Sequence, residues 1–289
     1  MKVDDWQDLI ELAKKQRLTP KEAWERIEKT NLKFLNRKST AEQQLKKGAR
    51  IQQLLFPKIK KEENIIYAKN LPSLDVSGDF YNFKHFGDKV FIVLGDVSGK
   101  GVDAGLIMAR VTTMFEILVE EKKSVREIVS LINNDLYTLV TGKFLTAIFG
   151  CYDKKSNNFE FVNAGHSNCI ISDNNKTNEH MSNKIPPLGV QFMKSDKDII
   201  LNQISLDEKI FYILSDGLSE SKDFTGKELE IDGVIKLIDK NRSQNIQTQL
   251  ENIFIEISAY GALQNIADEE KSIIKDDTTI LAINGKTNN

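Results

Sequence analysis

Four short motifs built around aspartate follow one another along this chain of 289 residues. They are Gly-Asp-Phe-Tyr at 78–81, Gly-Asp-Val-Ser-Gly-Lys-Gly at 95–101, Ser-Asp-Gly at 215–217 and Asp-Asp-Thr-Thr at 276–279. Each places an aspartate at the edge of an apolar run typical of a strand, where the carboxylate is held rigidly and faces water. Four such carboxylates, brought together, would form an oxygen-rich site for hard divalent cations such as Mg²⁺ or Mn²⁺. Two adjacent cations of this kind can activate water against a phosphate ester.

The glycine-rich motif at 95–101 precedes a helical pattern, as a phosphate-binding P-loop would. A P-loop has four residues between its first glycine and the Gly-Lys pair, and then Ser or Thr. Here three residues separate Gly95 from the Gly99-Lys100 pair, and Gly101 follows the lysine. The spacing excludes a P-loop and places the motif's aspartate at the end of the preceding strand. Taken alone, the motif is equally compatible with a glycine-rich turn capped by that aspartate.

Each of the other motifs is also compatible with an ordinary turn when it is taken alone. Asp79 follows two small residues, and Asp216 belongs to an Asp-Gly pair, which commonly marks a turn. Asp276 and Asp277 are adjacent. Adjacent residues of a strand point to opposite faces, so at most one of this pair enters a shared site directly. The prediction of a metal site therefore rests on the conjunction of the four motifs.

Composition excludes several classes of function. The chain has 40 basic and 42 acidic residues, a net charge of −2, which gives no general attraction to nucleic acid or to an anionic membrane. No apolar run has the length of a membrane-spanning helix, and the N-terminus lacks an apolar signal core. Cys151 and Cys169 form no CxxC motif, which disfavours a disulfide scaffold or a thiolate zinc site. We expect a cytoplasmic protein.

Residues 1–57 carry helical patterns and no strand signal. The sequence Thr-Pro-Lys-Glu at 19–22 is a capping box with proline at the first helical position. Another helix is predicted from Thr40 to Phe56, ending at Pro57. Its apolar stripe is too narrow for a core helix and too apolar for water, so it should pack on a second copy or on the rest of the chain. We expect a regulatory or dimerisation segment at 1–57.

The region from 58 to 289 has the pattern of a separate domain. Strands are predicted at 65–68, 78–83, 90–94, 144–152, 159–163, 169–172, 209–214 and 278–283. Helices are predicted at 103–119, 124–140, 232–240 and 247–260, and the second of them opens with a Ser-Val-Arg-Glu capping box. Strands outnumber helices, and many are joined by turns of hairpin length. This predicts an α+β fold with antiparallel sheets rather than alternating βαβ units.

The four motifs, in this order and at this separation, resemble the metal-dependent serine/threonine phosphatases of the PPM (protein phosphatase 2C) superfamily, in particular its bacterial SpoIIE/RsbU-like branch. Further agreement comes from Ala-Gly-His at 164–166, Pro-Leu-Gly at 187–189 and Arg-Ile-Gln-Gln-Leu-Leu-Phe-Pro at 50–57. The resemblance covers about residues 50–285. It implies a central sandwich of two antiparallel β-sheets flanked by helices, with two metal ions at one edge.

The resemblance also implies a role for individual residues. Asp96 would bridge two Mn²⁺ or Mg²⁺ ions, and the backbone carbonyl of Val97 would be a further ligand. The remaining metal ligands of the catalytic set would be Asp79, Asp216 and Asp276. Water bound between the ions would attack phosphorus in line, without a phosphoenzyme.

The chain departs from the eukaryotic members of the superfamily in two respects. Ser98 stands where those members carry a histidine proposed as the general acid, so protonation of the leaving group is unassigned. Their phosphate-binding arginine has no visible counterpart; Lys100 could contact the phosphate, but a solvated loop lysine is the favoured interpretation. His166, in the Gly-His turn, is expected to be structural rather than catalytic.

The resemblance implies a protein phosphatase acting on phosphoserine or phosphothreonine in bacterial signal transduction. The usual substrate in this branch is a STAS-domain anti-anti-sigma factor, whose kinase is also an anti-sigma factor, so sigma-factor regulation is expected. We also expect a homodimer, controlled by an upstream activator through the N-terminal helices. Two alternatives are a pseudophosphatase that serves as a binding module and a two-metal phosphodiesterase. The presence of all four aspartates disfavours the first, and the absence of histidine ligands disfavours the second.

Overall fold

The computed structural model describes residues 40, 42–59, 65–73, 75–139, 142–167, 169–222, 227–242, 244–265 and 276–285. The chain from Ala49 onward forms one compact unit, which contains all four aspartate motifs. The predicted capping box at 19–22 lies outside the described residues, so the part of the predicted N-terminal segment that precedes residue 40 stays a prediction.

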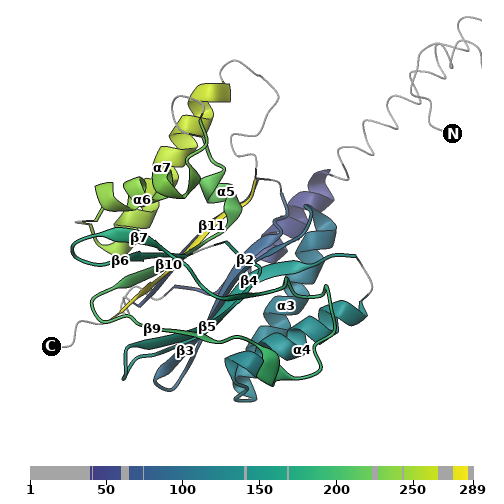
Figure 1. Cartoon of the computed structure of the whole chain (residues 1–289). Helices are drawn as coiled ribbons and strands as arrows, with labels where there is room; N and C mark the ends of the chain where they lie inside the picture. The colour runs from purple at the N-terminus through teal and green to yellow at the C-terminus, as the bar shows by residue number, and fades with distance from the viewer. Residues whose placement is uncertain are drawn as a thin grey trace, which may run out of the picture. The chain divides into compact units, whose positions relative to one another are not determined.

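Two β-sheets stack against each other in this unit (Figure 1). The first has the order β1(Ile66–Leu71), β11(Thr278–Asn284), β10(Ile210–Leu214), β6(Cys169–Ser172), β7(Thr177–His180). The second has the order β2(Asp79–Phe86), β3(Lys89–Val97), β4(Leu145–Asp153), β5(Asn158–Ala164), β8(Lys184–Ile185), and β9(Asn202–Ser205) also pairs with β5. Strand pairs within the sheets are antiparallel, except that β5 and β8 run parallel.

Helices cover the outer face of each sheet (Figure 1). Against the second sheet pack α3(Val102–Glu120) and α4(Val125–Thr138). Against the first sheet pack α6(Glu230–Lys240) and α7(Ile246–Asn265), next to the short α5(Asp216–Ser219). A 3₁₀ helix, η2(Asp196–Asp198), precedes β9. The predicted α+β sandwich of two sheets flanked by helices is confirmed.

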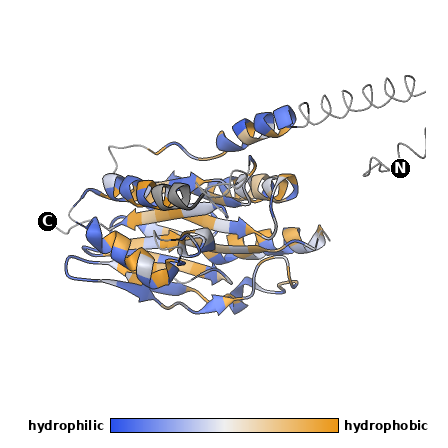
Figure 2. Cartoon of the chain, turned by 90° about the horizontal axis from the view of Figure 1, so that it is seen from above, coloured by the Kyte–Doolittle hydropathy of each residue, from blue (hydrophilic) through white to orange (hydrophobic). Residues whose placement is uncertain are grey.

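The alternation of apolar residues along β3 shows how the layers are built. Val93 belongs to the apolar cluster beneath α3 and α4, whereas Ile92 and Leu94 belong to the cluster between the two sheets. Figure 2 shows apolar residues gathered along the central strands. The same two-residue period places Asp96 on the inter-sheet face, at the end of the row that Ile92 and Leu94 begin. The aspartate of this motif therefore continues the row of core residues.

Helix boundaries agree closely with the sequence prediction where capping residues mark them. The side chain of Ser124 accepts a hydrogen bond from the backbone of Glu127, and the Glu127 carboxylate accepts one from the backbone N–H of Ser124. This is the predicted capping box, although α4 ends at Thr138 rather than at 140. The predicted helix at 40–56 is helical over 42–53 and turns through 54–56.

The short strands β7, β8 and β9 are absent from the sequence prediction. Two of them are four residues long and the third has two, and β7 and β9 consist mostly of polar residues. Such segments lack the alternating apolar run that marks a strand. Among the helices that the structure describes, none is long and apolar enough to cross a membrane.

Candidate metal centre

Asp79 and Asp96 lie side by side at one end of the inter-sheet layer. Asp79 begins β2, Asp96 is the next-to-last residue of β3, and the two are direct partners in the antiparallel register. The hydroxyl of Thr279, on the opposite sheet, donates a hydrogen bond of 2.7 Å to Oδ2 of Asp79. Asp79 is only 2% exposed, so the expectation that every carboxylate faces water is wrong for this residue. It lies inside the layer, where a hydroxyl replaces solvent.

These two carboxylates are electrostatically strained. Burial, followed by the negative charges of Asp216, Asp276 and Asp277, raises the pKa of Asp96 to about 7. Burial, followed by the charge of Asp96, raises the pKa of Asp79 well above its usual range. A carboxylate whose pKa rises in this way is disfavoured in its charged form. A nearby cation would relieve that cost, so the electrostatics suit a metal ion.

Asp216 reaches the same end of the sandwich from the first sheet. It is the first residue of α5, one residue beyond the end of β10, and is exposed to solvent. Partial desolvation, followed by the charge of Asp276, raises the pKa of Asp216. A Cβ atom on Gly217 would overlap the carbonyl oxygen of Asp277. The Asp-Gly pair of this motif is therefore required for the close approach of two chain segments, beyond any role in a turn.

The adjacent acids Asp276 and Asp277 have different partners. Asp277 is 5% exposed and accepts four hydrogen bonds of 2.7–2.9 Å, from the backbone and hydroxyl of Ser73, the hydroxyl of Ser77 and the backbone N–H of Gly78. Both of its oxygens are used in holding Ser73, Ser77 and Gly78. Asp276 instead faces the ammonium of Lys100, 2.9 Å from its Oδ1. Of the two acids, Asp276 is therefore the one paired with a lysine that also acts on Asp96 and Asp216.

Lys100 brings a positive charge to these carboxylates. Besides its ion pair with Asp276, it lowers the pKa of Asp96 and of Asp216, against the effect of burial. The favoured interpretation from sequence, a solvated loop lysine, is therefore incomplete. The side chain is 43% exposed, yet it is engaged with the acidic residues.

His166 ties the two sheets together beneath the acidic residues. Its Nε2 lies 2.9 Å from the carbonyl oxygen of Leu214, and its Nδ1 lies 3.1 Å from the hydroxyl of Thr146. Because a carbonyl only accepts, Nε2 carries the proton and Nδ1 accepts from the threonine. Burial lowers the pKa of His166 to about 4, so the ring is neutral at physiological pH. This geometry supports the structural role predicted for His166.

The polar frame around the aspartates is the part of the site that sequence reasoning missed. Thr146 on β4 is the register partner of Asp96, and Leu214 ends β10 two residues before Asp216, so the histidine contacts the strand beside Asp96 and the strand that leads to Asp216. Ser215 makes a reciprocal pair with the backbone of Thr279, at 2.9 and 2.8 Å. The available signal was a hydroxyl residue one or two positions from Asp79, Asp216 or Asp277, at 77, 215, 278 and 279.

The acidic residues have the chemistry of a metal site without the geometry of a closed one. Within the described ranges, no three His, Cys, Asp or Glu side chains are gathered tightly enough to hold an ion. The charges of Asp216 and Asp276 nevertheless both act on Asp96. Carboxylate oxygens are the ligands that Mg²⁺ and Mn²⁺ prefer, so these residues fit such ions once drawn together. Val97 is buried at the end of β3, beside Asp96.

Comparisons with known proteins agree with this architecture. The model of the family described as Stage II sporulation protein E (SpoIIE) matches residues 87–286. Phosphoserine phosphatase RsbU of Bacillus subtilis (strain 168) is 27% identical over 244 residues, which are 83% of this chain and 69% of RsbU. The SiaA-PP2C domain of Pseudomonas aeruginosa aligns with a TM-score of 0.72 at 17% identity, covering 87% of this chain and 98% of that domain. RsbX, crystallised in complex with magnesium, aligns with a TM-score of 0.53 at 16% identity, covering 75% and 92% of the two chains.

Proposed function

Because this chain belongs to the SpoIIE family, we propose that it is a metal-dependent protein serine/threonine phosphatase of the PPM type. The observation that carries this proposal is the pairing of Asp79 with Asp96 at one end of the sandwich, where the charges of Asp216 and Asp276 also act. A rigid sandwich that concentrates negative charge in this way suits a cationic cofactor. Mn²⁺ or Mg²⁺, two ions when bound, would supply Lewis acidity and a nucleophilic water.

We assign the ligand set to the four motif aspartates and one backbone carbonyl. Asp96 lies in electrostatic reach of both Asp216 and Asp276, which supports a bridging position for it. Asp79 stands beside it in the register, oriented by the hydroxyl of Thr279. The carbonyl of Val97 completes the proposed set. In this assignment Asp277 is a positioning residue, because its oxygens accept hydrogen bonds from Ser73, Ser77 and Gly78.

The proposed substrate is a phosphoserine or phosphothreonine on a STAS-domain anti-anti-sigma factor. Membership of the SpoIIE family and the similarity to RsbU, a phosphoserine phosphatase, support a role in partner-switching signalling in the bacterial cytoplasm. The solvent exposure of Asp216 and of Lys100 supports access for a folded phosphoprotein.

The segment at 1–57 is proposed to form a homodimer and to carry control by an upstream activator. The described end of its last helix exposes Ile51 and Leu54, at 64% and 83%, while Gln52 is buried. The Gln52 amide exchanges hydrogen bonds of 2.7 and 3.0 Å with the backbone of Ser77, whose hydroxyl donates to Asp277. Leu54→Asp should convert a dimer into a monomer in light scattering and change the Mn²⁺ requirement. A monomeric wild-type chain with an unchanged requirement in the variant would leave only a docking helix.

The enzymatic proposal is tested with the full chain, Mn²⁺ and two small esters. Metal-dependent hydrolysis of p-nitrophenyl phosphate, with little turnover of bis(p-nitrophenyl) phosphate, is the expected result. Preference for the diester would indicate a phosphodiesterase. Hydrolysis of neither ester, together with binding of a phosphorylated STAS protein, would indicate a pseudophosphatase. The substrate proposal is tested in parallel on each phosphorylated STAS protein of the same genome.

A further inference from the structure

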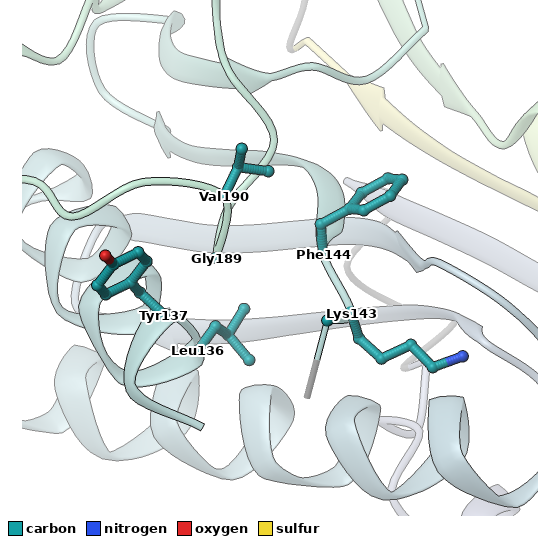
Figure 3. A pocket seen from close by; sticks show the side chains of 7 residues that line it. Leu136, Tyr137, Lys143, Phe144, Gly189 and Val190 are labelled. Atoms are coloured by element: carbon teal, nitrogen blue, oxygen red, sulfur yellow. The ribbon is translucent and has the colours of Figure 1, made fainter. Parts of the chain in front are cut away.

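A pocket of about 300 Å³ lies on the side of the second sheet that α4 covers (Figure 3). Its walls come from the end of α4, the segment before β4 and the loop after Leu188. The lining residues are Leu136, Tyr137, Gly142, Lys143, Phe144, Gly189 and Val190. Large apolar side chains stand exposed at its mouth, with Tyr137 at 45%, Phe144 at 41% and Val190 at 54%. We call this feature the α4 pocket.

The exposure of these side chains does not come from a loosely held loop. Asn133 and Asn134 on α4 fix the loop at 189–193 through four hydrogen bonds of 2.8–3.0 Å to its backbone. Phe192, also 54% exposed, packs edge to face against Tyr137 with ring centroids 6.1 Å apart. A rigid apolar surface loses little conformational entropy when a partner binds. The α4 pocket is thus preorganised for an apolar group.

The pocket is joined directly to the loop of the proposed metal centre. Ser98 donates its backbone N–H to the carbonyl of Phe144 at 2.9 Å, and its hydroxyl accepts from the Phe144 N–H at 3.0 Å. This pair extends the β3–β4 register in which Asp96 faces Thr146. An occupant of the pocket would therefore lie beside the segment that carries Asp96.

Lys143 links the pocket to the same loop by charge. A Cβ atom on Gly99 would overlap the Lys143 ammonium, so this cation lies directly against the loop that follows Asp96. In Figure 3 the Lys143 side chain extends away from Tyr137 and Val190. The arrangement presents a positive charge on the metal-loop side and an apolar surface on the other. A phosphoserine with an apolar neighbour has the complementary chemistry, since its phosphate carries a charge of about −2.

We propose that the α4 pocket binds an apolar side chain of the phosphoprotein substrate while Lys143 faces its phosphorylated residue. This inference rests on the proposed phosphatase function and adds a specificity site to it. The volume is at the lower end of the range for ligand pockets, roughly 300–1,000 Å³, and suits one large side chain rather than a helix. Continuity with the metal loop favours substrate over a second copy of the chain as the occupant.

The test uses the full chain with Mn²⁺ and synthetic phosphoserine peptides. A single phenylalanine is moved through every position on either side of the phosphoserine, in a background of glycine and serine. One position, or two adjacent ones, should raise kcat/KM about tenfold over the peptide without phenylalanine, as expected for burial of an aromatic side chain. In Val190→Asp and in Tyr137→Ser this gain should fall to about one. Ile255→Asp, an equally exposed apolar position on α7, should keep the gain.

Melting temperatures establish that each variant is folded before its peptide profile is compared. A flat profile in the wild type, or an unchanged gain in both folded pocket variants, overturns the proposal. Loss of dimer mass in light scattering of Val190→Asp, without a change in its peptide profile, would assign the surface to a second copy. Hydrolysis of p-nitrophenyl phosphate is measured separately. If the wild type hydrolyses that ester but no peptide, the specificity site is refuted and the metal centre stands; if it hydrolyses neither with Mn²⁺, the proposed function fails.

Discussion

The middle of the inter-sheet layer and its acidic edge have opposite effects on folding. In the middle of the layer, Phe159, Phe161 and Phe211 pack with ring centroids 5.1–5.3 Å apart and are fully buried. At its edge, the ends of β2 and β3 carry Asp79 and Asp96, whose pKa values burial raises. The apolar middle stabilises the fold, whereas burial of negative charge at the acidic edge opposes folding. The free energy gained by packing the apolar middle offsets the cost of burying negative charge at the acidic edge.

Removing the central charge of the acidic edge should have the largest effect on activity. In Asp96→Asn, turnover of p-nitrophenyl phosphate with saturating Mn²⁺ should fall further than the roughly 10–100-fold typical of losing a supporting residue. The reason is that one carboxylate is proposed to serve both ions. Steady-state kinetics of the two proteins check this result. Turnover near the wild-type level in the variant would rule out a bridging role.

Truncating the apolar middle should instead affect stability. Phe211→Ala removes a fully buried ring and should lower the free energy of unfolding by about 3–5 kcal/mol. Urea denaturation without metal measures it, with Ile255→Asp as a surface control. At a temperature where both proteins are folded, the Mn²⁺ requirement should remain as in the wild type. A large change in metal affinity would show that the apolar middle and the acidic edge of the layer are not independent.

A change at Asp277 should affect both stability and activity, because this residue belongs to the acidic edge but its carboxylate holds neighbouring backbone in place. Asp277→Asn leaves an amide opposite the backbone donors of Ser73 and Gly78, so one buried donor faces another. We expect a loss of about 1–3 kcal/mol in unfolding free energy, with reduced activity as an indirect result. Thermal melts of metal-free protein give the stability change. An unchanged melting temperature would show that the hydrogen bonds of this carboxylate to Ser73, Ser77 and Gly78 do not stabilise the fold.

The smallest expected effect is a pH dependence of the metal-free protein. The pKa of Asp96 is raised to about 7 in the folded chain, mainly by burial, so its ionisation opposes folding above its unfolded value. As far as this group is concerned, stability should therefore be greatest below about pH 4 and decline by about 1–3 kcal/mol between about pH 4 and pH 7. Asp96→Asn should flatten that decline. Denaturation at several pH values with a chelator present measures both slopes, and equal slopes would contradict the assignment.

The sequence was informative where local rules decide structure. Alternation along β3 and the capping box at Ser124 predicted elements that the structure contains. The depth of Asp79 could not be predicted, because it depends on Thr279, 200 positions away, which supplies the hydroxyl that replaces water. The same holds for the His166 contacts to Thr146 and Leu214, which exist only after the two sheets stack.

The α4 pocket illustrates the same limit of sequence reasoning. Asn133 and Asn134 read as ordinary polar residues of a helix, and the Pro-Leu-Gly stretch gave no sign of their partners. Their two side-chain amides hydrogen-bond to the backbone of the loop at 189–193 only because α4 packs against that loop. The order of the motif residues along the sequence predicts a metal centre. The residues that shape the α4 pocket are instead defined by contacts between distant parts of the chain.

The most direct test of the account is a calorimetric titration of Mn²⁺ into chelator-treated wild type and Asp96→Asn. The central claim is that the acidic edge of the sandwich is a cation site organised around Asp96. We predict that the wild type binds two ions and gains melting temperature as they bind. Asp96→Asn should lose this binding, although it folds and is more stable than the wild type in the absence of metal. Equal Mn²⁺ affinity and stoichiometry in the two proteins would contradict the claim.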